Sequence, residues 1–379
     1  MPAVPSAPAR SAAPKERVLV RRVTNLNNAV TEALDFLEYD FTNKKVWVKP
    51  NLLAPHPPEA SVTTDPELIR QVVRQLKSRA AKEIWVADNP GGKLHGDIET
   101  YIAPTGVVEA SEGCFRNLTK PPEILKLNSR FISQVPVSHI MFEADVILDM
   151  PVFKTHALTL LTGAIKNLFG TIPGGQKMHI HTFAKNAVEF AELLIDIFRA
   201  IPTPIINIMD ALRGMDGQNG PGGGRVLKIG KILAAHNSTA MDAVMALMAG
   251  IQPVQIPLLR IAAEHGLGPI QSDQIKIIGD FERIKGFRLP SRLLAGPAAG
   301  IVARIYPWFR RQPILKKNLC IRCQLCAKNC PVHAISMNPF PTINRKKCIS
   351  CYCCAETCPT HAMVVPTHWR GLINNIISR

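Results

Sequence analysis

Short apolar runs rich in valine and isoleucine alternate with longer amphipathic stretches over most of the chain. The short runs predict strands at residues 17–23, 45–49, 83–87, 145–149, 204–209, 230–236 and 274–279. Apolar residues at helical spacing predict helices at 157–169, 184–200 and 238–249. A further helix is predicted to begin at Asp65, the expected N-cap before Pro66. Strands separated by helices imply crossover connections, so we predict an α/β domain with a mostly parallel sheet flanked by helices.

Polar residues follow the predicted strands, at the end where a parallel sheet binds its ligands. They are Lys49, Asn51, Asp88, Asn89, Asp149, Lys154, His156, Asp210, His236 and Asn237. Each one alone is readily explained as a turn or helix-capping residue. Their recurrence at the same end of successive strands predicts a shared polar cleft.

The segment VFKTHALTLLTGAIKNLFG, residues 152–170, adds a specific prediction to this cleft. In the predicted helix, Thr159 and Lys166 share one face. Lys154 and His156 precede its N-terminus, and a helix N-terminus flanked by such residues suits a phosphate or a carboxylate. The alternative is an amphipathic surface helix with a solvated lysine.

A glycine-rich segment, GMDGQNGPGGG at 214–224, follows Asp210. Such a loop either lets the backbone approach a ligand closely or is simply a long connection. It lacks the spacing of phosphate-binding and dinucleotide-binding loops, so nicotinamide binding is not predicted. His179 and His181, with Asp210 or Asp216, could form a metal site or could be ordinary loop residues.

Nine of the ten cysteines lie in two runs, CIRCQLCAKNCP (320–331) and CISCYCCAETCP (348–359), which form an internal repeat. Each has the Cys-x2-Cys-x2-Cys-x3-Cys-Pro spacing of bacterial ferredoxins, in which the fourth cysteine of each run binds the other cluster. This predicts a small ferredoxin-like α+β domain with two [4Fe-4S] clusters. One ligand set is Cys320, Cys323, Cys326 and Cys358, and the other is Cys348, Cys351, Cys354 and Cys330. A zinc site would show paired Cys-x2-Cys knuckles separated by longer intervals.

Two cysteines fall outside this pattern. Using Cys353 in place of Cys354 would break the spacing of the second run, so we expect Cys353 to be a packed or partly exposed thiol. Cys114 lies far from the others in sequence, and we expect an ordinary free thiol there.

Charge is unevenly distributed along the chain, whose formal net charge is +16. The segment from Arg283 to Arg379 holds sixteen lysines and arginines against one acid, Glu356. This basic segment predicts an anionic partner, which we expect to be an acidic redox protein. No helix-turn-helix or RNA-stacking motif accompanies it, so nucleic acid is not expected. We see no export signal and no apolar stretch of bilayer length, and we therefore expect a cytoplasmic protein.

We divide the chain into a tail (1–16), the α/β domain (17–282), a basic apolar connector (283–315) and the cluster domain (316–379), which ends in an amphipathic helix. The connector and the final helix could lie on an anionic membrane surface as a peripheral contact. They could instead dock onto the α/β domain, which is the arrangement that electron delivery to a cleft requires. We favour docking.

Several motifs of this chain resemble the DUF362 family. They are VKPNL (48–52), TTDPELIRQVV (63–73), DMPVFKTHALTLLTGAIKNLFG (149–170), IMDALRGMDGQNGPGGG (208–224) and AMDAV around Asp242. The resemblance implies this α/β domain followed by a two-cluster ferredoxin domain, without implying a particular reaction. Residue matching carries over as site candidates Lys49, Asn51, Lys154, His156, Lys166, Asn167, Asp210 and Asp216. The Asn219-Gly220-Pro221 stretch, with its extra glycines, departs from the family pattern.

Together these features favour an iron–sulfur oxidoreductase that transfers electrons to or from an anionic small molecule. We predict catalytic roles for Lys154, His156, Lys166 and Asp210 and substrate-binding roles for Lys49, Asn51, Asn167 and Asp216. One alternative is a non-catalytic electron carrier or subunit that docks an acidic redox partner or a membrane complex. Another is a role in metal-cofactor assembly, with the clusters acting as sensors.

Overall fold

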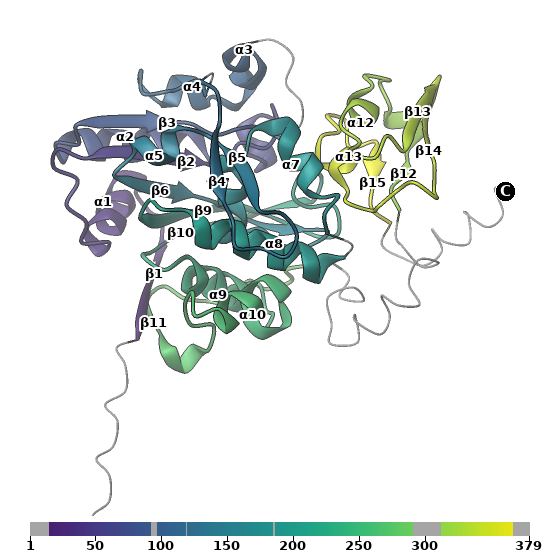
Figure 1. Ribbon diagram of the computed structural model, residues 1–379. Helices are drawn as coiled ribbons and strands as arrows, with labels where there is room; N and C mark the ends of the chain where they lie inside the picture. Colours follow the sequence, from purple (N-terminus) through teal and green to yellow (C-terminus); the bar gives the residue numbers. More distant parts are fainter. Residues whose placement is uncertain (1–14, 92–96, 119, 185, 291–311, 367–379) are drawn as a thin grey trace, which may run out of the picture.

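The computed structural model describes residues 15–91, 97–118, 120–184, 186–290 and 312–366 (Figure 1). Its main sheet has the strand order β11-β1-β10-β9-β6-β2-β3, with β7 beside β9 and β8 beside β7. The strands are β1 (Glu16–Arg22), β2 (Lys45–Pro50), β3 (Glu83–Val86), β6 (Val146–Met150), β7 (Val152–His156), β8 (Leu160–Leu161), β9 (Ile205–Asp216), β10 (Arg225–Ala235) and β11 (Ile275–Gly279). Within this sheet, as the structure describes it, five of the strand pairs are parallel and only β1–β10, β9–β10 and β7–β8 are antiparallel. The predicted mostly parallel α/β fold is therefore confirmed.

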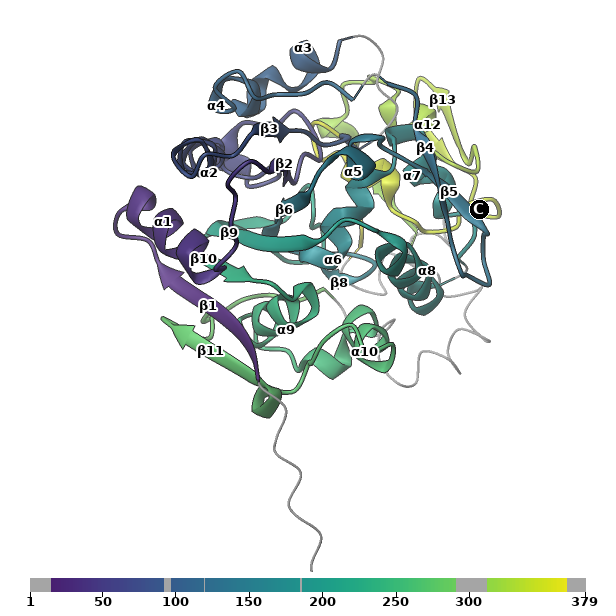
Figure 2. The same cartoon turned by 60° about the vertical axis from the view of Figure 1, so that its left-hand side comes forward.

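Helices cover both faces of this sheet (Figure 2). One face packs against α1 (Leu26–Phe36) and α2 (Pro66–Ser78), and the other against α8 (Ala187–Ala200), α9 (Ser238–Met248) and α10 (Pro257–Glu264). Alternation along β2 shows why both faces are buried, since Val46 and Val48 belong to one apolar cluster and Trp47 to the other. Asp65 caps α2 as predicted by accepting a 2.9 Å hydrogen bond from the backbone N–H of Glu67.

Shorter elements complete the α/β domain. They are α3 (Ile98–Ile102), α4 (Val107–Ala110), β4 (Glu123–Lys126), β5 (Gln134–Val137), α5 (Ile140–Glu143), α6 (Ala164–Asn167) and α7 (Gly174–Ile180). Single 3-10 turns lie at Pro58–Ala60, Ala103–Thr105, Leu168–Thr171, Pro253–Gln255, Ser272–Gln274 and Lys317–Leu319. The hairpin β4–β5 forms a separate two-stranded sheet.

The predicted helix at 157–169 is wrong. β7 turns back through residues 157–159 into β8, and only Ala164–Asn167 form α6, with a 3-10 turn after it. Lys154 therefore lies on a strand and Lys166 on a short helix, so no continuous helical face joins Thr159 to Lys166. The alternating apolar and β-branched residues of 152–156 fit a strand, and tertiary pairing with β9 decides the outcome. The helices predicted at 184–200 and 238–249 are confirmed as α8 and α9.

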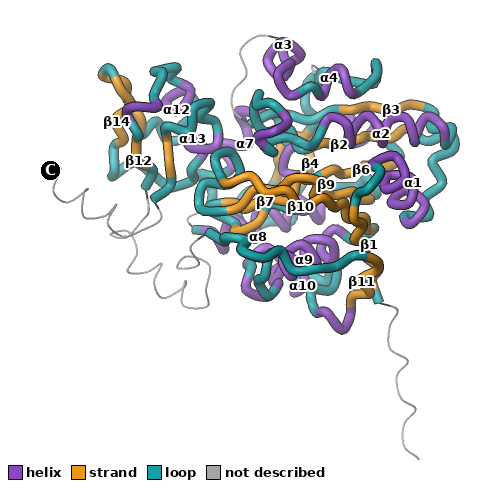
Figure 3. Tube along the Cα trace, turned by 180° about the vertical axis from the view of Figure 1, so that it is seen from behind, coloured by secondary structure: helices purple, strands orange, loops and turns teal. Residues whose placement is uncertain are grey.

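The C-terminal residues form a small α+β unit, called the cluster module here (residues 312–366), beside α7 (Figures 1 and 3). It contains β12 (Ile314–Leu315), α12 (Leu325–Lys328), β13 (Ile335–Asn338), β14 (Phe340–Ile343), α13 (Cys353–Glu356) and β15 (Met363–Val364). Most of the predicted connector, the final amphipathic helix and most of the predicted tail lie outside the described residues. Within the described ranges, no helix has the length and apolarity needed to span a membrane.

Candidate functional site

A buried ion pair lies where β2 and β3 end. The side chain of Lys49 is fully buried, and its Nζ lies 3.0 Å from Oδ1 of Asp88. The other oxygen of Asp88 accepts a 2.9 Å hydrogen bond from the backbone N–H of Leu52. Gly170 covers the pair so closely that a Cβ there would lie 2.7 Å from Lys49 Nζ and 2.5 Å from the Asp88 carboxylate. Glycine at position 170 therefore lets the chain pass over this pair.

Next to this pair, four side chains form a buried hydrogen-bonded chain, which we call the polar relay. Lys154 Nζ donates to Oδ1 of Asn51 at 2.5 Å and to the carbonyl of Val62 at 2.6 Å. Asn51 Nδ2 donates to Oδ1 of Asn167 at 2.8 Å, and Asn167 Nδ2 donates to Oδ1 of Asp149 at 2.7 Å. The relay brings together residues from β6, β7, α6 and the loop after β2, as the strand-end pattern predicts.

Burial perturbs both ends of the polar relay. Burial raises the pKa of Asp149 to about 8, although nearby Lys49 acts in the opposite direction. Oδ2 of Asp149 is buried without a hydrogen-bond partner among the described residues, as expected for a carboxyl group that keeps its proton. Burial and the neighbouring Lys166 lower the pKa of Lys154 to about 7. The relay therefore holds an acid and an amine that both titrate near neutral pH, a property typical of functional sites.

Asp242 on α9 holds α6 in place. Its carboxylate accepts hydrogen bonds of 2.7 Å and 3.1 Å from the backbone N–H groups of Ala164 and Ile165, the first two residues of α6. A Cβ at Gly163 would lie only 1.9 Å from this carboxylate, so glycine is required there. The contact fixes the short helix that carries Lys166 and Asn167. It also occupies the N-terminus of α6, so that end is not available for the anion that the sequence predicts.

His156 joins the sheet edge to the cluster module. Its Nδ1 accepts from the backbone N–H groups of Leu158 at 3.0 Å and Thr159 at 3.3 Å, which leaves the proton on Nε2. Nε2 lies 3.1 Å from Oε1 of Glu356 on α13. Burial and then Lys166 lower the pKa of His156 to about 4, so the ring is neutral at pH 7. His156 thus contacts the module and is not turned toward the relay.

Glu356 faces two histidines and a lysine across this interface. Burial alone would raise the pKa of Glu356, but His156, Lys166 and His181 lower it to about 2. Lys166 is partly exposed, and burial lowers its pKa while Glu356 and then Cys353 act against that effect. No hydrogen bond or ion pair of Lys166 is found within the described part of the chain. Its ammonium group is therefore available to a ligand at the boundary between the sheet edge and the module.

The predicted histidine pair does not form a metal site in the described residues. His181 is buried and stacks on Phe190 with a ring-centroid distance of 4.3 Å, whereas His179 lies edge-on to Phe183. Burial lowers the pKa of His181 to about 3. No three His, Cys, Asp or Glu side chains converge on one ion position in the ranges described. Within those ranges, the two histidines are packing residues.

The glycine-rich segment is the tip of the β9–β10 hairpin, and it contacts the cluster module. A Cβ on Gly222 would lie 3.1 Å from the Glu356 carbonyl oxygen, and one on Gly223 would lie 3.0 Å from the ring of His361. Asn219 Oδ1 accepts a 2.8 Å hydrogen bond from the backbone N–H of Val365. The sequence left open whether this loop lets the backbone approach a ligand closely or is simply a long connection. In the structure its backbone does approach another group closely, but that group is the cluster module.

The two predicted aspartates of β9, Asp210 and Asp216, lie outside the polar relay. Asp210 accepts backbone hydrogen bonds of 2.8 Å from Asp65 and 3.0 Å from Leu212, and burial raises its pKa to about 7. Asp216 pairs with the guanidinium of Arg225 at 2.6 Å and accepts a 2.8 Å hydrogen bond from the backbone of Arg288. Both oxygens of Asp216 are occupied, so the structure does not bring this residue to the site.

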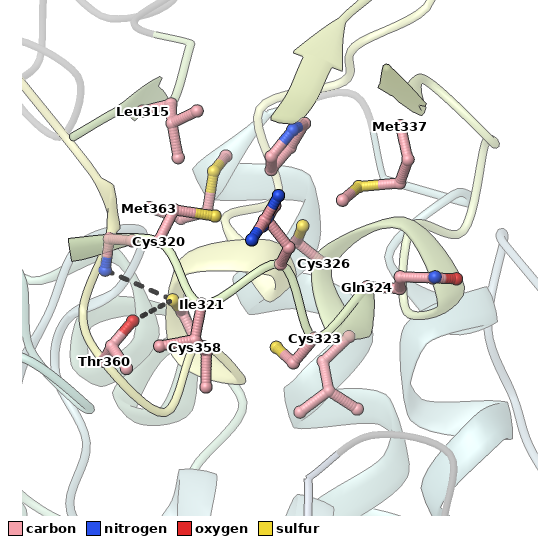
Figure 4. A pocket seen from close by; sticks show the side chains of 14 residues that line it. Leu315, Cys320, Ile321, Cys323, Gln324, Cys326, Met337, Cys358, Thr360 and Met363 are labelled. Atoms are coloured by element: carbon pink, nitrogen blue, oxygen red, sulfur yellow. Dashed lines mark hydrogen bonds between the residues drawn. The ribbon is translucent and has the colours of Figure 1, made fainter. Parts of the chain in front are cut away.

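The cysteines of the module line two separate cavities. Cys320, Cys323, Cys326 and Cys358 line one of about 320 Å³, shown in Figure 4. Cys330, Cys348, Cys351 and Cys354 line the other, of about 330 Å³. The remaining lining side chains are largely apolar. Four thiols spread around a dry cavity suit a cubane cluster, whose irons occupy separate corners, better than a single ion.

Comparison with known proteins agrees with this geometry. Residues 46–247, more than half of the chain, match the family model described as "Domain of unknown function (DUF362)". This chain belongs to the DUF362 family. Residues 319–362 match a second family model, described as a 4Fe-4S dicluster domain. The DUF362 match covers the polar relay, His156 and Lys166, and the second match covers both cavities.

A curated relative of this DUF362 protein is the "Thylakoid-associated protein sll1697" of Synechocystis sp. (strain ATCC 27184 / PCC 6803 / Kazusa). It is 29% identical over 233 residues, which cover 60% of this chain and 70% of the relative.

Two solved structures share 13% sequence identity with the DUF362 protein. One is a structural genomics target from Thermotoga maritima, with a TM-score of 0.38 over 60% of this chain and 59% of that structure. The other is the lactate racemase apoprotein from Thermoanaerobacterium thermosaccharolyticum, with a TM-score of 0.39 over 62% and 57%. The chain thus spans less than two thirds of the length of either structure.

Two residues of this DUF362 protein that matter to the site were not among the predicted site residues. Glu356 lies between two predicted cluster ligands. The sequence feature that could have identified it as a site residue is that it is the only acid after Arg283. Asp242 lies inside an otherwise apolar helical stretch, AMDAV, where a buried carboxylate needs a polar partner.

Proposed function

We propose that this protein is an oxidoreductase with two [4Fe-4S] clusters that transfers electrons to or from an anionic small molecule at the polar relay. The eight cysteines around two cavities support two clusters with the ligand sets predicted from the spacing. When bound, the clusters supply single electrons. The protein is then a redox enzyme whose substrate binds in its α/β domain.

The contact between Glu356 and His156 carries this proposal. Glu356 lies two residues from both Cys354 and Cys358, one ligand from each proposed set. The same contact fixes the module at the sheet edge, where Lys166 and the polar relay lie. Both cavities are therefore close to the residues proposed to bind the substrate, which is the arrangement that electron delivery requires.

The basic side chains have different roles at the proposed site. Lys166 binds the anionic group of the substrate, because Lys49 and Lys154 are held by protein partners and no partner of Lys166 is found among the described residues. Lys154, with a pKa of about 7, serves as the proton donor, since a catalytic acid works best when its pKa is near the working pH. Asn51 and Asn167 hold Lys154 in place, and Lys49 is held by Asp88. His156 positions the module and does not exchange the proton.

The test compares Lys166→Gln with Lys126→Gln, which neutralises an exposed lysine on β4. Each protein is isolated without oxygen, its iron and acid-labile sulfide are counted, and the EPR spectrum of its reduced clusters is recorded with added phosphate or malonate. We expect both variants to keep their iron. We expect the anions to alter the spectra of the wild type and Lys126→Gln but not that of Lys166→Gln.

The opposite result would favour a different function. If neither anion changes the spectrum of the wild type, or if Lys166→Gln responds as the wild type does, the oxidoreductase proposal is wrong. The protein would then be an electron carrier in which the α/β domain is a docking scaffold.

We also propose a peripheral membrane contact through residues 291–311 of the basic apolar connector (283–315). The composition of this segment and the name of the thylakoid-associated relative support it. Co-sedimentation with phosphatidylserine vesicles, and its loss on deletion of this segment, would test the contact. Vesicle binding that survives the deletion would refute it.

A further inference from the structure

The cluster module has two related faces, because its two cysteine runs repeat in structure as well as in sequence. Position 320 corresponds to 348, so Lys328 corresponds to Glu356 and His333 to His361. The backbones agree closely at these positions. Gln324 and Tyr352 both have φ 66°, and each precedes a four-residue helix, α12 or α13. His333 and His361 have φ values of 49° and 53°.

Among the residues that the structure describes, only one of the two faces is covered. On the inner face, Tyr352 is 3% exposed, Glu356 contacts His156, and His361 stacks on His56 at a ring-centroid distance of 5.2 Å. On the outer face, Gln324, Lys328 and His333 are all exposed. The first cysteine run thus repeats the backbone arrangement with which the second run contacts the α/β domain, and its corresponding side chains are exposed.

The two faces differ in charge at one corresponding position. The inner face presents Glu356 to His156 and toward the ammonium of Lys166 in the α/β domain. The outer face has Lys328 in its place and adds Arg322 beside it in the first run. The described part of the module contains seven lysines and arginines and no acid other than Glu356. The outer face is basic, whereas the inner face presents an acid to the α/β domain. A partner that matches the outer face in charge must therefore be acidic.

The outer face also has the composition of a surface at which an electron-transfer protein docks. Ile321 is 63% exposed and Leu319 is 40% exposed, and both lie next to a proposed cluster ligand, Cys320. Cys323 is itself exposed. Apolar side chains at the centre of a charged surface favour protein docking over a purely electrostatic contact. An exposed ligand thiol shortens the path between a docked carrier and the first cavity.

We propose that the outer face, defined by Leu319, Ile321, Arg322, Cys323, Gln324, Lys328 and His333, binds a small acidic electron-carrier protein. This inference rests on the proposed redox function and names its partner. The carrier is a reduced one-electron iron–sulfur or flavin protein. Cys320, Cys323, Cys326 and Cys358 would hold the [4Fe-4S] cluster that is reduced by one electron as the carrier's cofactor is oxidised by one. No bond forms or breaks, and no proton moves.

The experiment measures binding and does not depend on turnover. The full chain is prepared without oxygen, and its dissociation constants for an acidic [2Fe-2S] ferredoxin and an acidic flavodoxin are measured by calorimetry at low and high salt. Lys328→Glu reverses the charge at the centre of the outer face. Lys346→Glu makes the same change at an exposed lysine beside the second run and is the matched control.

We expect at least one acidic carrier to bind the wild type. Lys328→Glu should weaken that binding about tenfold at low salt and less at high salt, whereas Lys346→Glu should weaken it less than about twofold. Equal losses in the two variants, or no binding of either carrier, would overturn the proposal. Binding of the wild type to vesicles of phosphatidylcholine and phosphatidylserine that Lys328→Glu abolishes, without carrier binding, would assign the face to a membrane instead.

The outcome is separable from that of the proposed substrate site. If Lys328→Glu loses carrier binding while added anions still alter the spectrum of its reduced clusters, the docking face and the substrate site are both supported. If the carrier binds at this face but no anion affects the clusters, the docking face stands and the oxidoreductase proposal fails.

Discussion

Replacement of Lys154 by methionine tests whether a lysine in the polar relay has lost its charge. Lys154 is 1% exposed, and its pKa in the folded protein is about 7 instead of 10.5. Burial is the main cause, Lys166 adds to it, and Glu356, Asp210 and Asp88 act against it. Because the folded chain holds this proton less tightly than the unfolded chain, Lys154 destabilises the fold at low pH. The penalty is largest below pH 7 and disappears as the pH rises toward 10.5.

The magnitude follows from proton linkage. A tenfold change in proton affinity corresponds to about 1.4 kcal/mol, so the full penalty is about 5 kcal/mol, and about 2 to 3 kcal/mol of it is relieved between pH 6 and pH 9. Methionine removes the penalty, but it leaves Asn51 Oδ1 and the Val62 carbonyl without their donor. That second cost, about 1 to 3 kcal/mol for each acceptor, changes little with pH.

Urea unfolding of the wild type and Lys154→Met at pH 6 and pH 9 gives the result. Tryptophan fluorescence is a suitable signal, since Trp47 and Trp85 are buried in the sheet. The wild type should gain about 2 to 3 kcal/mol over Lys154→Met between the two pH values. Lys276→Met, which removes an exposed lysine of β11, controls for the loss of a positive charge. A difference that stays constant with pH, or that shifts toward Lys154→Met as the pH rises from 6 to 9, would show that Lys154 keeps its charge in the folded protein.

Two further predictions concern the cluster ligands and the ion pair. Cys354→Ala should lose about half of the bound iron and acid-labile sulfide, whereas the matched Cys353→Ala should keep all of it, because Cys354 lines a cavity with three other proposed ligands and Cys353 does not. Equal iron content in the two variants would contradict the ligand assignment. Gly170→Ala should lower the melting temperature by several degrees, because its Cβ would meet Lys49 Nζ and the Asp88 carboxylate. Gly222→Ala is its control, since Gly222, like Gly170, has no positive φ and a Cβ there would come no closer than 3.1 Å to its neighbours, and an equal loss there would refute the steric explanation.

Local pattern predicted the strands and most of the long helices because each depends mainly on its own residues. The valine-rich and isoleucine-rich runs became strands of the sheet, and Asp65 and Pro66 began α2 as expected. The segment 157–169 failed because its helical periodicity competes with the pairing of Leu160 and Leu161 to β7 and with the backbone hydrogen bonds donated to Asp242, a residue far away in sequence. Long-range contacts of this kind leave no periodic signal in a single segment.

The candidate site shows the same division. The polar residues at strand ends were found because parallel strands place their carboxyl ends together, and Lys49, Asn51, Asn167 and Lys154 do meet. Asp216 was misplaced because its partner, Arg225, lies across a hairpin that the sequence did not predict. The role of Glu356 could not be predicted either, since it depends on how the module is oriented against the α/β domain.

The charges at this interface connect the perturbed pKa values with the proposed substrate. Lys154, Lys166 and Lys177 all have lowered pKa values, and burial is the first cause in each case. Lys166 also lowers the pKa values of the other two, so the site holds more positive charge than its surroundings stabilise. Glu356 offsets part of this excess from the module side. A bound anion would offset more of it and would favour the protonated lysines, so substrate binding and proton uptake are coupled. Under the proposed redox function, proton uptake by the protein on substrate binding would favour reduction, because electrons from the module would arrive where protons are already held.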